Sequence, residues 1–196
     1  MRYKRMIILV ICAFLAAVIL TLGCGNSAAE YVIKGAGFFK LGQGDEAIAA
    51  YNKAIDIDPN TATAYLGRGT VYYTKGEKDK TIADCTRAIE LDPTDSHSYS
   101  LRGVAYFDKG DYDKAIADFN KAIEIDPKYT LAYYYRGNAY HKKGEYDKTI
   151  ADYTKAIELD PKYVMAYNNR GLTYQKIGDN SKAEADIKKA KELGFK

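Results

Sequence analysis

The sequence of 196 residues has few of the side chains that most often carry catalysis or bind metals. It contains two histidines, three cysteines and four prolines. Cys12 and Cys24 both lie near the amino terminus, so no disulfide framework is indicated. A glycine-rich phosphate loop, a His-Glu-x-x-His motif and a Gly-x-Ser-x-Gly motif are all missing. We therefore expect no enzyme, with no catalytic residues, no metal site and no cofactor.

The sequence also has no excess of one charge beyond its first few residues. The formal net charge of +3 comes from Arg2, Lys4 and Arg5. Without the first 24 residues, 26 basic side chains stand against 26 acidic ones. Nucleic-acid-binding domains usually carry a basic patch, so this balance argues against a nucleic-acid partner.

The prolines divide the chain at equal intervals. They are Pro59, Pro93, Pro127 and Pro161, each 34 residues after the one before. The segment that ends at each proline reads as two short amphipathic helices around a glycine, closed by Asp-Pro. A fixed period of this length is typical of stacked helical hairpins. The sequence thus predicts an all-α domain over residues 28–196, with five units at 28–61, 62–95, 96–129, 130–163 and 164–196.

Counted from the first residue of each unit, the same residue types recur at fixed positions. Position 8 is Gly35, Gly69, Gly103, Gly137 and Gly171, and position 27 is Ala54, Ala88, Ala122, Ala156 and Ala190. Position 4 is always tyrosine, and position 11 is always aromatic. This pattern resembles the tetratricopeptide repeat. The resemblance implies a right-handed solenoid of five helix-turn-helix hairpins that binds proteins or extended peptide segments.

Two features of the register concern structure rather than binding. Position 7 is arginine and position 23 is aspartate in units two to five, whereas unit one has neither. Because the two residues are missing together from unit one, we expect them to pair within each of the other hairpins. The expected ion pairs are Arg68–Asp84, Arg102–Asp118, Arg136–Asp152 and Arg170–Asp186. In the last unit Glu184 and Lys191 replace recurring isoleucines, which indicates a solvated end with no sixth hairpin.

The amino-terminal segment, residues 1–24, has a different character. Its basic start is followed by the apolar run Met6–Leu20, which is typical of an export signal or a membrane anchor helix. Leu22-Gly23-Cys24 resembles the bacterial lipoprotein box, which implies lipidation of Cys24. A cleaved lipoprotein and an uncleaved single-pass anchor both remain open. Either one predicts a membrane-anchored, extracytoplasmic domain (periplasmic or on the cell surface) after a short linker at 25–27.

The resemblance also implies where partners bind, because positions 2, 5, 9 and 12 of the first helix in each unit line the concave face in this family. The candidate groove residues are Leu66, Tyr73, His97, Phe107, Tyr134, Asn138, His141 and Asn168. Alternatively, the aromatic members pack against neighbouring helices. The two histidines are one hairpin apart and roughly 15 Å apart along a helix, too far to share a metal ion.

Three functions are compatible with these observations. The first is a membrane-tethered adaptor that binds protein segments in an envelope assembly or secretion-related complex. The second is a small-ligand or enzymatic site in the groove. The third is a self-associating scaffold that forms a homo-oligomer.

Overall fold

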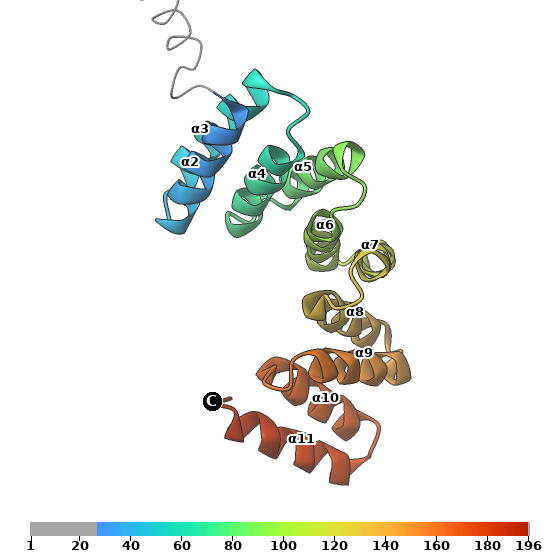
Figure 1. Ribbon diagram of the computed structural model, residues 1–196. Helices are drawn as coiled ribbons and strands as arrows, with labels where there is room; N and C mark the ends of the chain where they lie inside the picture. The colour runs from blue at the N-terminus through green and yellow to red at the C-terminus, as the bar shows by residue number, and fades with distance from the viewer. Residues whose placement is uncertain (1–26, 196) are drawn as a thin grey trace, which may run out of the picture.

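A computed structural model describes residues 27–195, so the predicted signal or anchor helix and Cys24 lie outside the described residues. Within this range the chain forms ten α-helices and no strand, arranged as five hairpins along an arc (Figure 1). The helices are α2 (Ala28–Lys40), α3 (Gly44–Ile57), α4 (Ala62–Thr74), α5 (Lys78–Leu91), α6 (Ser96–Lys109), α7 (Tyr112–Ile125), α8 (Thr130–Lys143), α9 (Tyr146–Leu159), α10 (Val164–Lys176) and α11 (Asn180–Glu192). Each hairpin packs on its sequence neighbours, as expected for a solenoid.

A glycine in the left-handed region ends the first helix of each hairpin. Gly110 has φ 84°, and the backbone N–H of the next residue, Asp111, donates to the carbonyl of Tyr106 one turn back. This geometry satisfies carbonyls that the helix end leaves free, and a residue without Cβ adopts it at no steric cost. The equivalent glycines are Gly42, Gly76, Gly144 and Gly178, all with positive φ. The predicted turn positions are confirmed.

An Asp-Pro pair ends the second helix of each of the first four hairpins. Asp126 is extended, with φ −125°, and its side chain accepts a hydrogen bond from the backbone N–H of Lys128 at 2.9 Å. Proline at the next position cannot continue a helix, and it favours an extended residue before it. The chain then turns into the next hairpin within four residues, which fixes the step of the solenoid.

The two helices of a hairpin approach each other at the position-8 glycine. A Cβ added to Gly103 would lie 2.8 Å from the ring of Phe119, and one added to Gly137 would lie 2.9 Å from the ring of Tyr153. Phe119 and Tyr153 stand at position 24 of the second helix, facing the glycine of their own hairpin. The alanines at position 27 are also buried. Small residues on one helix thus make room for an aromatic ring on the other.

The predicted arginine–aspartate pairs are present in all four hairpins. Arg136 donates from Nε and Nη2 to the two carboxylate oxygens of Asp152, at 2.8 and 2.6 Å. The same two-bond geometry joins Arg68 to Asp84, Arg102 to Asp118 and Arg170 to Asp186. The aspartates are buried, and the guanidinium groups are largely covered. Two parallel bonds fix the geometry of both partners.

The third bond of each arginine crosses to the hairpin before it, which the sequence analysis did not predict. Nη1 of Arg136 donates to Oδ1 of Asn120 at 2.7 Å, and Nη1 of Arg102 donates to Oγ1 of Thr86 at 3.0 Å. Arg68 reaches Asn52 and Arg170 reaches Thr154 in the same way. All four acceptors stand at position 25. Each arginine therefore connects both helices of its own hairpin to the preceding one.

A second set of ion pairs joins neighbouring hairpins at their turns. Lys75 lies 2.6 Å from Asp45, and Lys143 lies 2.5 Å from Asp113, measured from Nζ to Oδ1. Lys109 pairs with Asp79 in the same way. The aspartates are exposed, so each pair contributes little to stability.

The two ends of the described solenoid differ. On α11, Glu184 and Lys191 are exposed, in agreement with the predicted solvated end. On α2, by contrast, Ile33 and Leu41 are 72% and 75% exposed, the highest values among the large apolar side chains that the structure describes. No helix in the described residues is both long and apolar enough to cross a membrane.

Candidate binding groove

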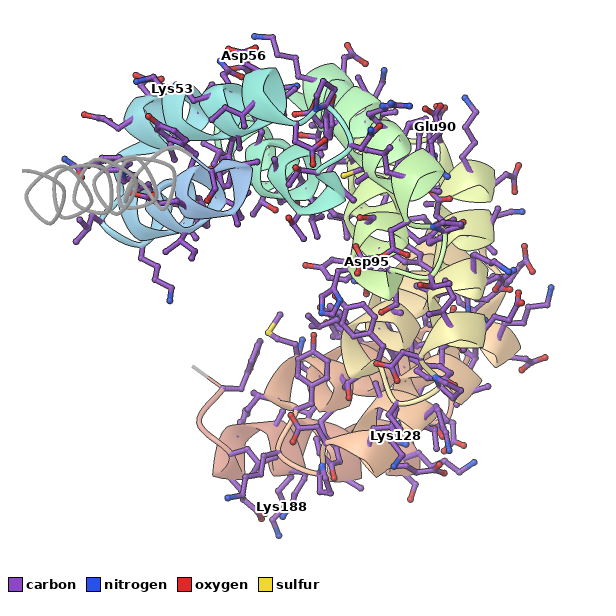
Figure 2. All side chains as sticks on the ribbon, turned by 45° about the horizontal axis from the view of Figure 1, so that its top comes forward. Lys53, Asp56, Glu90, Asp95, Lys128 and Lys188 are labelled. Carbon is purple, nitrogen blue, oxygen red and sulfur yellow. The ribbon has the colours of Figure 1, made fainter. Side chains whose placement is uncertain are left out.

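The first helix of each hairpin faces the inside of the arc. Figure 1 shows α6 on the inner side and its partner α7 on the outer side. Lys53, Asp56 and Glu90, which belong to the second helices α3 and α5, point away from the inside of the arc (Figure 2). The concave surface is therefore made mainly by α4, α6, α8 and α10, and it holds two hollows.

The larger of these, which we call the apolar hollow, has a volume of about 300 Å³ and spans α4, α6 and α8. Its lining consists of Leu66, Thr70, Tyr73, His97, Ser100, Leu101, Val104, Tyr129, Leu131 and Tyr135. No carboxylate, lysine or arginine lines it. Its walls therefore suit aliphatic or aromatic side chains.

Neighbouring groups hold the aromatic walls of the apolar hollow in place. The Tyr73 hydroxyl donates to Oδ2 of Asp108 at 2.9 Å, and the Tyr135 ring stacks on Phe119 with centroids 6.1 Å apart. The ring of His97 lies 5.0 Å from that of Tyr129. Burial raises the pKa of Tyr129 and of Tyr135, which keeps both phenols neutral. These contacts preorganise the aromatic surface.

The second, which we call the carboxamide hollow, has a volume of about 270 Å³ and lies toward the carboxyl-terminal end. Its lining consists of Phe107, Asn138, His141, Lys142, Tyr153, Asn169 and Leu172. Tyr153 donates its hydroxyl to Oδ1 of Asn138 at 2.6 Å, and Nδ2 of Asn169 donates to the same oxygen at 3.3 Å. Within the described residues, the Asn138 amide nitrogen makes no hydrogen bond of its own. An amide nitrogen in this state can donate to a carbonyl or carboxylate oxygen.

His141 and Lys142 set the charge of the carboxamide hollow. Burial lowers the pKa of His141, and the positive charges of Lys142 and Lys176 lower it further. His141 is therefore neutral at pH 7, and Lys142 is the cation in the lining. The hollow combines polar donors with the apolar surfaces of Phe107 and Leu172.

The structure divides the candidate groove residues into three groups. Leu66, Tyr73 and His97 line the apolar hollow, and Phe107, Asn138 and His141 line the carboxamide hollow. Tyr134 and Asn168 are buried, with 8% and 9% of their surfaces exposed. The Tyr134 ring packs against Tyr153 and Tyr163 with centroids 5.8 and 5.0 Å away, and its hydroxyl accepts a hydrogen bond from Asn169. The aromatic residues were expected either to line the groove or to pack against neighbouring helices, and Tyr134 does the second.

The sequence analysis missed the groove residues at position 6. Leu101 and Tyr135 line the apolar hollow, and Asn169 lines the carboxamide hollow. A signal for them was present, because position 6 is glycine in unit two, Gly67, and a different, larger residue in each later unit. A position that changes size and polarity in an otherwise regular repeat is a candidate for shaping a binding surface.

Neither hollow holds a cluster of side chains that could bind a metal ion. Among the described residues, no three His, Cys, Asp or Glu side chains come together as metal ligands. Cys85, at position 24 of the second unit, is fully buried, and this burial raises the pKa of its thiol to about 12. The arrangement offers shape, apolar surface and hydrogen-bond donors, which are the means of binding.

Comparison with known proteins supports the repeat assignment. A family model described as TPR repeat matches residues 35–76, 103–144 and 137–178. Models described as tetratricopeptide repeat match residues 62–95, 85–117 and 166–193. No curated protein matches the chain significantly.

Solved structures share the fold. A crystal structure of MamA is 33% identical over 81% of this chain and 93% of its own, with a TM-score of 0.75. YrrB, a TPR protein with an unusual peptide-binding site, is 22% identical over 91% of both chains, with a TM-score of 0.72. PilF of Pseudomonas aeruginosa is 16% identical over 86% of this chain and 77% of its own, with a TM-score of 0.80. YrrB and PilF are similar in fold alone. The repeat register, the hairpin geometry and these matches together show that the chain belongs to the tetratricopeptide repeat family.

Proposed function

We propose that this protein is a membrane-tethered, extracytoplasmic adaptor that binds an extended segment of a partner protein along its concave groove. The apolar hollow is the observation that carries the proposal. It is a largely apolar recess on the inner face of three consecutive hairpins, where an extended chain can contact several units at once. YrrB, which has the same fold, is described as having a peptide-binding site.

The two hollows suggest what the bound segment contains. Leu131, which is 43% exposed, offers its side chain to an aliphatic or aromatic anchor in the apolar hollow. The free amide nitrogen of Asn138 and the cation of Lys142 favour a carbonyl or an acidic group next to it. The preferred segment is thus apolar at one end and polar or acidic at the other.

The membrane part of the proposal rests on the sequence. A basic start, the apolar run Met6–Leu20 and Leu22-Gly23-Cys24 precede the solenoid directly. Lipidation of Cys24 or an uncleaved anchor would each hold the first hairpin close to the bilayer. The intact mass of protein extracted from membranes distinguishes the two, because a lipidated chain begins at Cys24 and an anchored one at Met1.

A selection with random dodecapeptides displayed on phage tests the groove. We expect peptides with an aliphatic or aromatic anchor to be enriched, and their affinity to change little with salt, because no carboxylate, lysine or arginine lines the apolar hollow. Leu131→Asp should abolish their binding, because it places a charge in the apolar wall. Ile57→Asp is the matched control, since Ile57 is an equally exposed aliphatic residue on α3 that lines neither hollow.

The selection can also contradict the proposal. If no peptide is enriched, or if the enriched peptides bind Leu131→Asp and the parent protein equally well, the concave groove is not the binding site.

A further inference from the structure

On α2 the surface around position 10, which is buried in every later hairpin, is left open. Positions 6, 10 and 14 of the first unit are Ile33, Gly37 and Leu41. They recur every four residues along the helix, so with Ala29 they form one stripe, which we call the outer stripe. Ile33 and Leu41 are highly exposed, and a Cβ added at Gly37 would meet nothing within 4 Å.

Position 10 is covered in every unit that follows, whereas position 14, which is Lys75, Lys109, Lys143 and Ile177, is exposed there as well. At position 10, Val71, Ala105, Ala139 and Thr173 are completely buried. In the second hairpin, a Cβ added at Gly67 would lie 2.4 Å from the ring of Tyr51 in the hairpin before it. The surface around Gly37 is thus where a preceding hairpin would pack, and Ile33 and Leu41 on either side of it have no cover within the described residues.

The chain itself indicates what lies beside this stripe. The apolar run Met6–Leu20 and Cys24 precede α2, and Ser27 already caps it, accepting a hydrogen bond from the backbone N–H of Glu30. Between Cys24 and α2 there are only three residues, which span at most about 10 Å. A bilayer that holds the segment before α2 therefore lies within reach of the outer stripe. Confinement at this distance gives a high effective concentration, so weak contacts suffice.

The charges beside the stripe fit a lipid surface. Lys34 and Lys40 flank it and are exposed, and Lys34 also pairs with Glu30 at 2.9 Å. Apolar side chains bordered by lysines are typical of helices that lie in the membrane interface, with the amines among lipid phosphates. The opposite end of the solenoid, with Glu184 and Lys191 exposed, lacks such a surface.

We propose that the outer stripe of α2 lies on the membrane surface, so that the bilayer takes the place of a preceding hairpin. This inference rests on the proposed tether. It adds an orientation, because a stripe in contact along its length places α2 parallel to the bilayer. α2 is about 20 Å long, so Leu41 would be held away from the lipids if the helix stood upright on its tether. The solenoid then extends outward and leaves its groove open to partners.

Tryptophan fluorescence tests this arrangement directly, because the chain has no tryptophan of its own. The full-length variants Leu41→Trp and Ile177→Trp are placed in vesicles of phosphatidylethanolamine and phosphatidylglycerol that contain brominated lipid. Ile177 is the matched control, since it is exposed and stands at the same position 14 of the last unit. We expect the emission of Leu41→Trp to be blue-shifted and mostly quenched, and that of Ile177→Trp to be unaffected. Adding Ile33→Glu to Leu41→Trp should reduce the quenching.

Flotation of the same vesicles measures separately whether the protein is attached to the membrane. If the protein floats but Leu41→Trp is not quenched, the proposed contact of α2 with the membrane is wrong, while the membrane attachment through the amino terminus is supported. If the protein does not float, the tether is wrong and the docking falls with it. A blue shift without quenching by brominated lipid would mean that protein covers the stripe, either a second copy or another segment of this chain, and would overturn the proposal.

Discussion

The guanidinium of Arg102 donates two parallel hydrogen bonds to the carboxylate of Asp118, from Nε to Oδ2 at 2.9 Å and from Nη2 to Oδ1 at 2.8 Å. The partners lie on the two helices of one hairpin, α6 and α7, and a third bond reaches Thr86 on α5. One side chain therefore connects three helices, and the effects of removing its bonds can be predicted separately.

Arg102→Met should lower the free energy of unfolding by about 3 kcal/mol, because it leaves the buried carboxylate of Asp118 without its counter-charge. The double variant Arg102→Met with Asp118→Leu should recover most of this loss, since two apolar side chains can share the space. Urea denaturation measures both. Lys143→Met, which breaks an exposed pair, should cost less than about 1 kcal/mol. Equal losses in the single and double variants would contradict the prediction.

Asn120→Ala should lower stability by about 0.5–1.5 kcal/mol, because Nη1 of Arg136 loses its acceptor on the preceding hairpin at a site that water can reach. Lys188→Ala is the control, since Lys188 holds the same position 25 in α11, and its effect should stay within about 0.5 kcal/mol. Urea midpoints compare the two. A loss in Lys188→Ala as large as that in Asn120→Ala would show that position 25 acts through helix propensity instead.

Gly103→Ala should destabilise the protein by about 1–3 kcal/mol, because the new methyl group would lie 2.8 Å from the ring of Phe119. Gly137→Leu should cost at least as much, with Tyr153 in the same place. Gly37→Ala should instead stabilise the protein by about 0.5–1 kcal/mol, since Gly37 lies in a helix with open space beside it. Opposite shifts of the melting temperature confirm this. Similar shifts for Gly103→Ala and Gly37→Ala would show that the close approach is absent.

The buried thiol of Cys85 should make stability fall at alkaline pH. Burial raises its pKa in the folded state to about 12 from an ordinary value near 9, so the unfolded chain loses this proton first. Between these two values the folded state binds one proton more, and stability drops by about 1.4 kcal/mol per pH unit. Below pH 9 the thiol is protonated in both states, so it does not make the unfolding free energy depend on pH.

Cys85→Ala provides the comparison for this pH dependence. Its unfolding free energy should fall less steeply than that of the parent protein between pH 9 and 11, while the tyrosines contribute equally to both. Parallel curves would contradict a buried, protonated thiol.

Much of the fold could be predicted because the sequence contains five versions of the same unit. A residue that recurs, such as the glycine before each second helix, reveals its role by recurrence. The arginine–aspartate pairs were found in the same way, since Lys34 and Ala50 replace both partners in the first unit. Repetition thus supplied a comparison that a single sequence usually lacks.

The groove could be predicted only in part, because its surface depends on residues that do not recur. Whether the side chain at position 5 faces the groove depends on its neighbours in the next hairpin. Tyr134 is buried because Asn169 and Tyr163 pack over it. The third bond of each arginine was missed for a related reason, since Asn120 and Thr86 read as ordinary surface residues. Cys24 lies outside the described residues, and its lipidation stays a prediction.

The bonds across the hairpin joints have one more consequence. Position 25 is Asn52, Thr86, Asn120 and Thr154, and each of these accepts from the arginine that follows. If residues 96–129 were deleted, Arg136 would meet Thr86, and Lys143 would meet Asp79, with the same chemistry as before. These polar bonds are interchangeable between joints, but the aromatic packing is not, because Tyr135, which stacks on Phe119, would meet Cys85 instead. Losing or gaining a unit would therefore alter the reach of the arc and the number of side chains that it presents, with the polar bonds of each joint kept and its aromatic packing changed.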